Sequence, residues 1–572
     1  FDDDEAGNKI TEYYIDYFKG LRKKHSTIIR SITQLKFPGK NKDANQLLQD
    51  KKLNEYLKNQ KNYKPIYFDP LFEPINENID KEQEQINHDS NYGFYVHRNK
   101  YYYIKKARNE KERNQPIVNS DFVFRIIYRL NDGSNNQKRL VKFQQSDPKG
   151  NPGKISIMEL SSEDFNLNKF KTTVRSNGLT FLGNQFNLDK ILQKYMPNES
   201  IAKPITVLGY QPDEEIYVFS NAIITPENDV IYLNSLGMAE YKNQVFYIPV
   251  AGYANKDDKS YEEHRKFYFK AGKLNFRDYT KLMVDAYGIK AAIAISYFIS
   301  SIFRDFIFKI TDYFPYLFLY GPMSKGKSSF MRMLLYIFGD EPNTITLNSN
   351  AKAISRLFGQ FRNALVYGTE YSYTVDKTLT DILKVGYDGK AYSIAQKTAD
   401  NKTKSYTVES AIAIDGNYPP DKEAALFSRN IIIDFEEMEF DDNTKNAFEK
   451  LKYEREQGFG QLLLELFEHN RVFKKEYSQT FDRVKNNLIN KNSAENEQLL
   501  SRLIEHMAFI LTPIEILFKR LNININIDDI SNELWDYIAQ QNDFFTDTDP
   551  IKIYWQSFDW GRIQPGYEFS EG

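Results

Sequence analysis

The chain has 572 residues, 41% of them hydrophobic, and this length predicts several domains rather than one core. Its formal net charge of −2 excludes a chain-wide attraction to nucleic acid, so any such contact must be local. The absence of cysteine excludes disulfides and thiolate metal sites, and with no run of 18 apolar residues we expect a cytoplasmic protein without a membrane partner.

Two short signatures stand in residues 1–62. Asp2 and Asp4 are separated by one residue and followed by Ala6 and Gly7, and a KDAN turn occupies residues 42–45. Two carboxylates spaced this way at the end of a strand can share a divalent cation, although an acidic cluster alone is more often only solvated.

Together the two signatures resemble the second half of a Toprim domain, as found in bacterial and phage primases. The resemblance implies a partial Toprim α/β fold in residues 1–62, with Asp2 and Asp4 as ligands of the catalytic metals. The family also needs a glutamate upstream of the acidic strand, which lies outside this sequence. We therefore expect no primer synthesis from this chain alone.

Residues 63–270 favour short strands and predict one or two α+β modules. Strands are expected at 94–105, 122–130, 141–143, 155–158, 205–208, 215–219, 230–233 and 245–250, with a helix at 186–195. The many Tyr and Lys residues would suit a nucleic-acid face, but aromatic residues in strands more often form core, and no site is assigned here.

The most specific motif is a phosphate loop at residues 321–328, GPMSKGKS. One or two helices at 274–314 precede it, a buried strand at 316–320 leads into it, and a helix follows, which is the context that the motif requires. Gly321 and Gly326 would let the backbone fold around a phosphate, toward which the amides at the helix start, Ser329 included, would point. Lys327 would reach the β- and γ-phosphates of ATP, and the Ser328 hydroxyl would hold Mg²⁺.

Three polar residues beyond this loop suit nucleotide hydrolysis. Glu370 follows an apolar strand at 364–367 and is the candidate for activating water. Asn417 follows a strand at 411–414, where an amide can hold the γ-phosphate or the water. Arg429 precedes a strand at 431–435 and is the candidate for an arginine finger on a neighbouring subunit's nucleotide. Singly, the last two are better explained by a turn asparagine and a surface arginine, but the four parts in this order favour the functional interpretation.

This ordered set resembles the superfamily 3 helicases, the AAA+ motors of viral and mobile-element primase-helicases. The resemblance implies an AAA+ core with a parallel sheet at 271–440, a collar within 63–270 and a helical region at 441–572. It also implies an ATP-driven ring, with a hexamer as the expected size, that moves 3′ to 5′ on single-stranded DNA. Many such ATPases carry Asp-Glu where this chain has Thr369 and Glu370.

In the same family a hairpin inside the ring contacts DNA, and here it corresponds to residues 382–410. Lys397, Lys402 and Lys404 would then touch the phosphates of a single strand. A solvated loop with scattered lysines is the alternative.

We therefore predict an α/β multidomain chain that forms the motor of a phage or mobile-element primase-helicase. Two alternatives are a RecA-type hexameric primase-helicase and a nucleotide-switched DNA-binding or assembly ATPase that does not unwind.

Overall fold

The computed structural model describes residues 31–35, 63–67, 92–105, 115–134, 136–340, 343–390, 393–395, 403–405, 407–435, 441–494 and 499–547. The described residues divide into two compact units. Unit 1 runs up to Thr206 and includes Asn221–Thr225 and Asp229–Tyr261, and unit 2 comprises Val207–Ser220, Pro226–Asn228 and the residues from Glu262 onward. The domain boundaries expected at 62, 270 and 440 stay a prediction.

The two earliest described segments are strands. They are β1 (Ser31–Leu35) and β2 (Tyr63–Tyr67), which pair antiparallel. Asp2, Asp4 and residues 42–45 lie outside the described residues. The metal site of a Toprim domain therefore stays a prediction.

Unit 1 is built on a six-stranded mixed sheet with the order β14-β15-β9-β6-β7-β8. Its strands are β6 (Phe122–Leu130), β7 (Lys138–Ser146), β8 (Pro152–Leu160), β9 (Ser200–Pro204), β14 (Met238–Tyr241) and β15 (Gln244–Tyr247). Unit 1 also contains the small sheet β3 (Phe94–His97), β4 (Lys100–Lys105) and β5 (Gln115–Val118), the pair β12 (Ala222–Ile224) and β13 (Val230–Tyr232), and the helices α5 (Leu167–Ser176) and α6 (Gln185–Tyr195). The next helix, α7 (Glu262–Lys266), belongs to unit 2.

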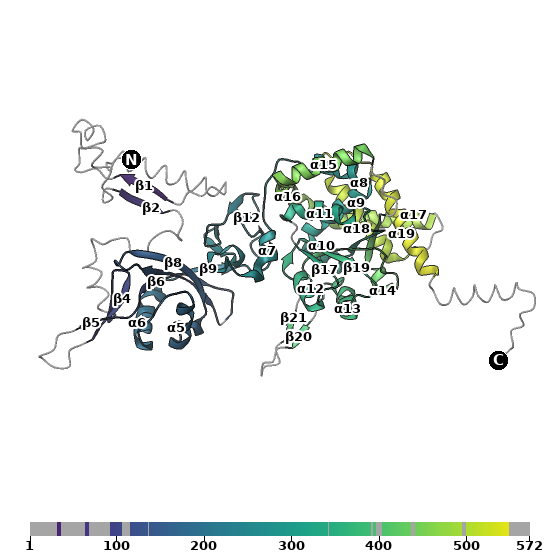
Figure 1. Cartoon of the computed structure of the whole chain (residues 1–572). Coiled ribbons are helices and arrows are strands. Elements are labelled where there is room, and N and C mark those ends of the chain that lie inside the picture. Colours follow the sequence, from purple (N-terminus) through teal and green to yellow (C-terminus); the bar gives the residue numbers. More distant parts are fainter. Residues whose placement is uncertain are drawn as a thin grey trace, which may run out of the picture. The chain divides into compact units, whose positions relative to one another are not determined.

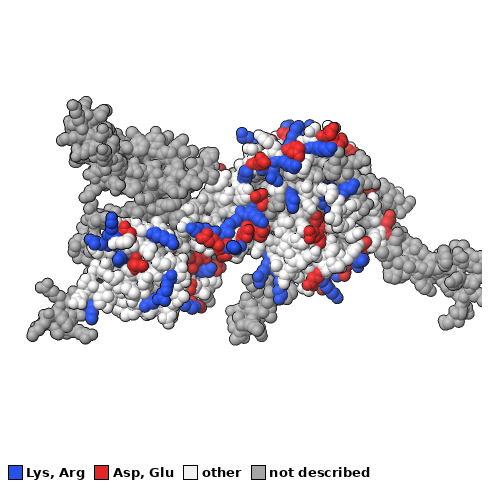
Figure 2. Space-filling model, in the orientation of Figure 1, with Lys and Arg blue, Asp and Glu red and all other residues white. Residues whose placement is uncertain are grey.

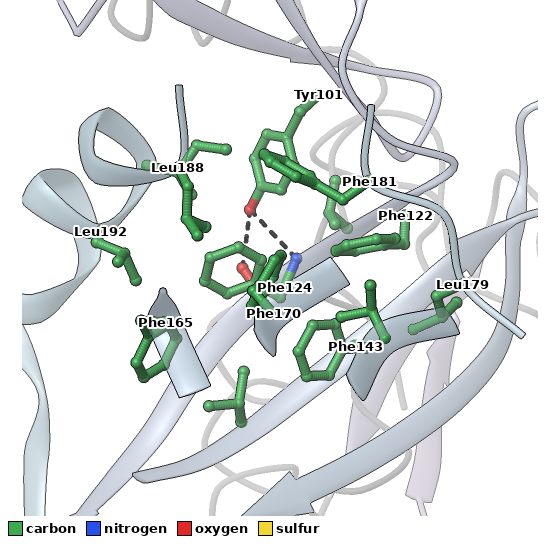
Figure 3. Packing of buried hydrophobic residues seen from close by; sticks show 14 of the residues in the cluster. Tyr101, Phe122, Phe124, Phe143, Phe165, Phe170, Leu179, Phe181, Leu188 and Leu192 are labelled. Carbon is green, nitrogen blue, oxygen red and sulfur yellow. Dashed lines mark hydrogen bonds between the residues drawn. The ribbon is translucent and has the colours of Figure 1, made fainter. Parts of the chain in front are cut away.

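Aromatic side chains form the core between the large sheet of unit 1 and helices α5 and α6 (Figure 3). Phe124 of β6 lies 6.0 Å from Phe170 of α5 between ring centroids, and Phe122 lies 5.4 Å from Phe143 of β7. Burying each such ring stabilises the fold by about 1.5–3 kcal/mol. A second buried cluster, which includes Leu140, covers the other face of the sheet.

At Phe124, the backbone of β6 is hydrogen-bonded by the side chain of Tyr101 instead of by a neighbouring strand. Parallel pairing with β9 reaches only from Tyr128 to Leu130. At Phe124, the hydroxyl of the fully buried Tyr101 donates to the carbonyl at 2.9 Å and accepts from the amide at 3.2 Å (Figure 3). One hydroxyl thus satisfies two backbone groups that no strand covers.

Unit 2 contains a five-stranded, fully parallel sheet with the order β17-β19-β22-β16-β23. The strands are β16 (Tyr316–Tyr320), β17 (Thr344–Thr346), β19 (Leu365–Tyr371), β22 (Ala411–Gly416) and β23 (Asn430–Asp434). The central strands are continuous apolar runs because a parallel sheet is covered on both faces. The parallel sheet expected in the nucleotide-binding core is confirmed.

Helices surround this sheet (Figure 1). They are α8 (Phe276–Tyr287), α9 (Lys290–Ile302), α10 (Arg304–Thr311), α11 (Lys327–Leu335), α12 (Ala351–Phe358), α13 (Lys377–Gly386), α14 (Ala424–Phe427), α15 (Asp442–Gln457), α16 (Gly460–Glu468), α17 (Asn470–Ala494), α18 (Ser501–Leu517) and α19 (Ile527–Asp547). Short strands β10 (Leu208–Gln211), β11 (Ile216–Val218) and β18 (Phe361–Arg362) form an edge sheet, and β20 (Ser393–Ala395) pairs antiparallel with β21 (Thr403–Ser405).

Helix α9 is the most hydrophobic helix near the sheet, and all its residues from Ala291 to Ile302 are buried. Among the described residues, no single helix has the length and hydropathy of a membrane span. Within the described part of the chain, only α9 and α10 together, bent by 90° at their junction, reach that length and composition.

The structure corrects two strand predictions. The strand expected at 94–105 is the hairpin β3–β4, which turns at Arg98 (φ 50°) and Asn99 (φ 54°). The strand expected at 205–208 is wrong, because the chain passes from unit 1 to unit 2 within it. The Ile205 amide still bonds the Tyr247 carbonyl in unit 1, whereas the Leu208 amide bonds the Gln360 carbonyl in unit 2.

Candidate functional site

The loop at residues 321–328 joins β16 to α11, as the sequence predicts. Gly321 has a φ of 140° and Gly326 a φ of 90°, conformations that glycine adopts without strain. Gly326 is the N-cap residue of α11 and provides no side-chain cap. The amides of the first helical turn are therefore available to an anion.

Lys327 lies inside this loop. Its Nζ donates to the carbonyl oxygens of Gly321 at 2.5 Å and Pro322 at 2.8 Å. Burial lowers the pKa of Lys327, and the nearby Asp415 carboxylate partly offsets that effect. The ammonium group is thus held beside the amides that face an anion.

Asp415 is a residue of this site that the sequence analysis did not single out. It lies in β22, paired with Leu319 of β16, and is only 6% exposed. Its Oδ2 accepts hydrogen bonds from the Ser328 hydroxyl at 3.1 Å and the Tyr367 hydroxyl at 2.7 Å. Its Oδ1 accepts one from the Glu370 amide at 3.0 Å. One carboxylate therefore connects the phosphate loop to the neighbouring strand.

Glu370 lies within β19 rather than after it, at a register shift between Gly368 and Tyr371. Its φ of 63° falls in the left-handed region that side chains other than glycine seldom adopt. Glu370 itself is exposed and lines the same cavity as the phosphate loop. The bulge therefore turns an exposed carboxylate toward the loop.

The cavity at the carboxyl ends of β16, β19 and β22 has a volume of about 580 Å³. The predicted site residues Gly326, Lys327, Ser328 and Ser329 line it with Glu370, Asn417 and Asp415, and Gly321 adjoins it through its bond to Lys327. Parallel strands bring these segments to one edge, where ligands of open α/β sheets bind.

Oxygen atoms dominate the donor set in this cavity. The Ser328 hydroxyl and the carboxylates of Asp415 and Glu370 are the kind of groups that Mg²⁺ prefers. In the part of the chain that the structure describes, no three His, Cys, Asp or Glu side chains form a metal cluster. The residues therefore fit a magnesium ion that arrives with a phosphate ligand and keeps water molecules, not one held by protein groups alone.

Arg429 lies at the amino ends of the strands, opposite the ends that form the cavity. Its carbonyl accepts from the amide of Tyr316, the first residue of β16, whereas the phosphate loop follows the last residue of that strand. Its guanidinium donates to the Ala425 carbonyl and lies 5.4 Å from the Tyr387 ring centroid. The strand length separates Arg429 from the cavity of its own chain by on the order of 15 Å.

The predicted DNA-contacting lysines are only partly covered by the structure. Lys397 and Lys402 lie outside the described residues. Lys404 lies in β21, opposite Ile394 of β20. The antiparallel pair forms a hairpin within the expected residues 382–410, but those up to Gly386 belong to helix α13 instead. The contacts of the three lysines stay a prediction.

With this geometry in view, comparison with known proteins gives one informative result. The chain superposes on a structure described as the active helicase Cch of SCCmec type IV with a TM-score of 0.52 and 14% identity, covering 82% of each chain. This chain therefore shares the fold of that structure. No protein-family model and no curated protein matches the chain.

Two further solved structures match with lower TM-scores. One is the C-terminal region of NrS-1 (TM-score 0.27, 11% identity, 72% of this chain and 90% of that chain). The other is JCV helicase (TM-score 0.23, 13% identity, 40% of this chain and 67% of that chain). At these scores neither adds to the likeness described above.

Proposed function

We propose that the chain is an ATP-hydrolysing DNA helicase that moves on single-stranded DNA as a ring. The observation that carries the proposal is the cavity in which Lys327, Ser328, Glu370 and Asn417 meet. There the loop at 321–328 meets an exposed carboxylate and an amide, a combination that suits ATP hydrolysis and supports the proposal.

Each of these residues has a role in the proposed reaction. Lys327 neutralises charge on the β- and γ-phosphates, and Ser328 would hold Mg²⁺, which supplies further charge neutralisation when bound. Glu370 orients the attacking water and accepts its proton. Asn417 holds the water or the γ-phosphate in line.

The strand order supports an AAA+ motor. The phosphate-loop strand β16 lies between β22 and β23, and β19 carries Glu370 one strand further out. The distance between Arg429 and its own cavity supports a finger that acts on a neighbouring subunit, and hence a ring, for which a hexamer is the proposed size. The proposal also includes a fused primase domain, in which Asp2 and Asp4 would bind the catalytic metals, and a phage or mobile-element origin.

DNA would be held locally rather than by the overall charge. On the face shown in Figure 2, basic and acidic side chains are interspersed over α15. Several pair along α15, as Lys452 does with Glu449 at 2.7 Å. The hairpin β20–β21 with its lysines is therefore the proposed DNA contact.

Strand separation coupled to ATP hydrolysis tests this function. A duplex with a 3′ tail should be unwound only with ATP and Mg²⁺, and one with a 5′ tail should not. Lys327→Ala should abolish unwinding and ATPase activity, whereas Lys352→Ala, an exposed lysine of α12, should leave both unchanged. DNA-stimulated hydrolysis without strand separation would instead indicate a nucleotide-switched assembly protein.

A further inference from the structure

The position that resembled ATPases give to an aspartate is occupied by Thr369, which has no charge. Its Oγ1 lies 3.4 Å from the Oγ1 of Thr346 in β17, the strand on the side away from the phosphate loop. A nucleotide site with this arrangement lacks a second acid on β19, beside the water-activating Glu370, to support the ion that Ser328 would hold.

One strand closer to the loop, Asp415 supplies such an acid. Its carboxylate is buried, and its three described hydrogen-bond donors are neutral: the hydroxyls of Ser328 and Tyr367 and the backbone amide of Glu370. A buried carboxylate with neutral partners is costly unless a cation compensates it. The ammonium group of Lys327 provides part of that compensation.

We propose that Asp415 is the magnesium-positioning residue of this site and replaces the acid missing at Thr369. The inference rests on the proposed ATP hydrolysis. When Ser328 offers a lone pair of its hydroxyl to the ion, the hydroxyl hydrogen points to Asp415, which orients that ligand and raises its basicity. Through its other oxygen, Asp415 accepts a hydrogen bond from the amide of Glu370. The same carboxylate therefore positions both the ligand of the ion and the water-activating residue.

The test is the magnesium dependence of nucleotide affinity in the full chain. A fluorescent, non-hydrolysable ATP analogue is titrated in EDTA and at increasing Mg²⁺. Asp415→Asn keeps the shape of the side chain but removes its charge. It should raise the Mg²⁺ concentration for half-maximal tightening by about tenfold or more while leaving the EDTA affinity within about twofold. Asp415→Ser gives the same test if the Asn variant does not fold.

Two further variants separate positioning from packing. Tyr367→Phe removes another donor to the same oxygen and should leave the Mg²⁺ midpoint unchanged. Adding Thr369→Asp to Asp415→Asn puts an acid at the position where the resembled ATPases carry one, and it should restore the midpoint toward the parent value.

The outcomes are distinct from those for the proposed function itself. An unchanged Mg²⁺ midpoint in Asp415→Asn, or an equal loss of affinity with and without Mg²⁺, overturns the positioning role. A parent chain that binds no nucleotide in either condition overturns the proposed function instead. A raised midpoint that Thr369→Asp reverses supports the replacement of one acid by the other.

Discussion

The backbone of Glu370 is held in a conformation that costs energy. A left-handed φ at a residue other than glycine or asparagine costs on the order of 1–3 kcal/mol and persists only where its surroundings enforce it. Here the hydrogen bond from its amide to Asp415 and the register shift in β19 provide that constraint. Such strain at a cavity wall agrees with a functional role for the side chain.

Glu370→Gln should therefore separate binding from hydrolysis. The amide keeps the size of the carboxylate but cannot accept a proton from water. Turnover should fall by at least about a hundredfold, while the affinity for ATP stays near that of the parent. Single-turnover hydrolysis and nucleotide titration measure the two quantities. Turnover at the parent rate would place the water-activating residue elsewhere.

The sequence predicts part of this site, and the register of the sheet determines the rest. Lys327 and Ser328 follow from a local motif whose spacing is fixed by the loop. Asp415 is 87 residues from Ser328, and only the pairing of β22 with β16 and β19 brings the two side chains together. In the sequence Asp415 precedes Gly416 and Asn417 and is typical of a turn, so no local pattern marks it.

Among the elements, β6 depends on a side chain for part of its pairing. Tyr101→Phe should leave the Phe124 amide and carbonyl without a partner in the core and reduce the stability of unit 1 by about 1–3 kcal/mol. Hydrogen exchange at the Phe124 amide should become faster. Tyr103→Phe, at a half-buried position of β4, the strand that contains Tyr101, is the matched control. Equal exchange in the two variants would contradict the role given to Tyr101.

The hairpin β20–β21 is the element to which DNA binding is assigned. Changing Lys402 and Lys404 together to Ala should weaken single-strand binding and reduce its salt dependence by roughly one unit of slope per lost phosphate contact. Basal ATPase activity should remain, and its stimulation by DNA should fall. Lys352→Ala with Lys377→Ala removes the same charge from exposed positions on other helices. If both double variants bind alike, the lysines of the hairpin are not the DNA contact.

Element prediction succeeds where a pattern is long and fails where a turn lacks its usual residues. The strand at 316–320 is confirmed as β16, and Phe122–Leu130 as β6. The β3–β4 turn was missed because Arg98 and Asn99 occupy positive φ where glycine is the stronger signal. Likewise, three helices stand where one or two were expected before β16, because the sharp bend between α9 and α10 has no proline or glycine.

At the scale of the whole molecule, the position of Arg429 predicts that active sites are shared between subunits. Arg429→Ala and Lys327→Ala proteins should each be inactive. Mixed in equal amounts, they should regain activity, because about a quarter of the interfaces would combine an intact Lys327 with an intact Arg429. ATPase activity of the mixture measures the effect. Arg502→Ala, which removes another cation from the Tyr387 ring, is the control. Zero rescue would argue for a site within one chain.

The stability of unit 2 should also depend on pH through His506. This side chain of α18 is buried, and its Nε2 lies 3.0 Å from the Tyr387 hydroxyl. Burial, followed by the charge of Arg502, lowers the pKa of His506 to about 3. An unfolded histidine has a pKa of about 6.5, so between these values the unfolded state binds one more proton.

Stability should consequently fall as the pH drops below about 6.5, by about 1 kcal/mol from this residue between pH 7.0 and 5.5. His506→Gln should reduce that pH dependence by about one proton, whatever it does to stability at pH 7. Trp535 of α19 is buried and lies in unit 2, so urea unfolding followed by tryptophan fluorescence reports on the unit that contains α18. His264, whose pKa burial lowers to about 4, still titrates in the variant, so part of the acid dependence should persist. An identical pH slope in the parent and the variant would show that His506 is not protonated on unfolding in this range.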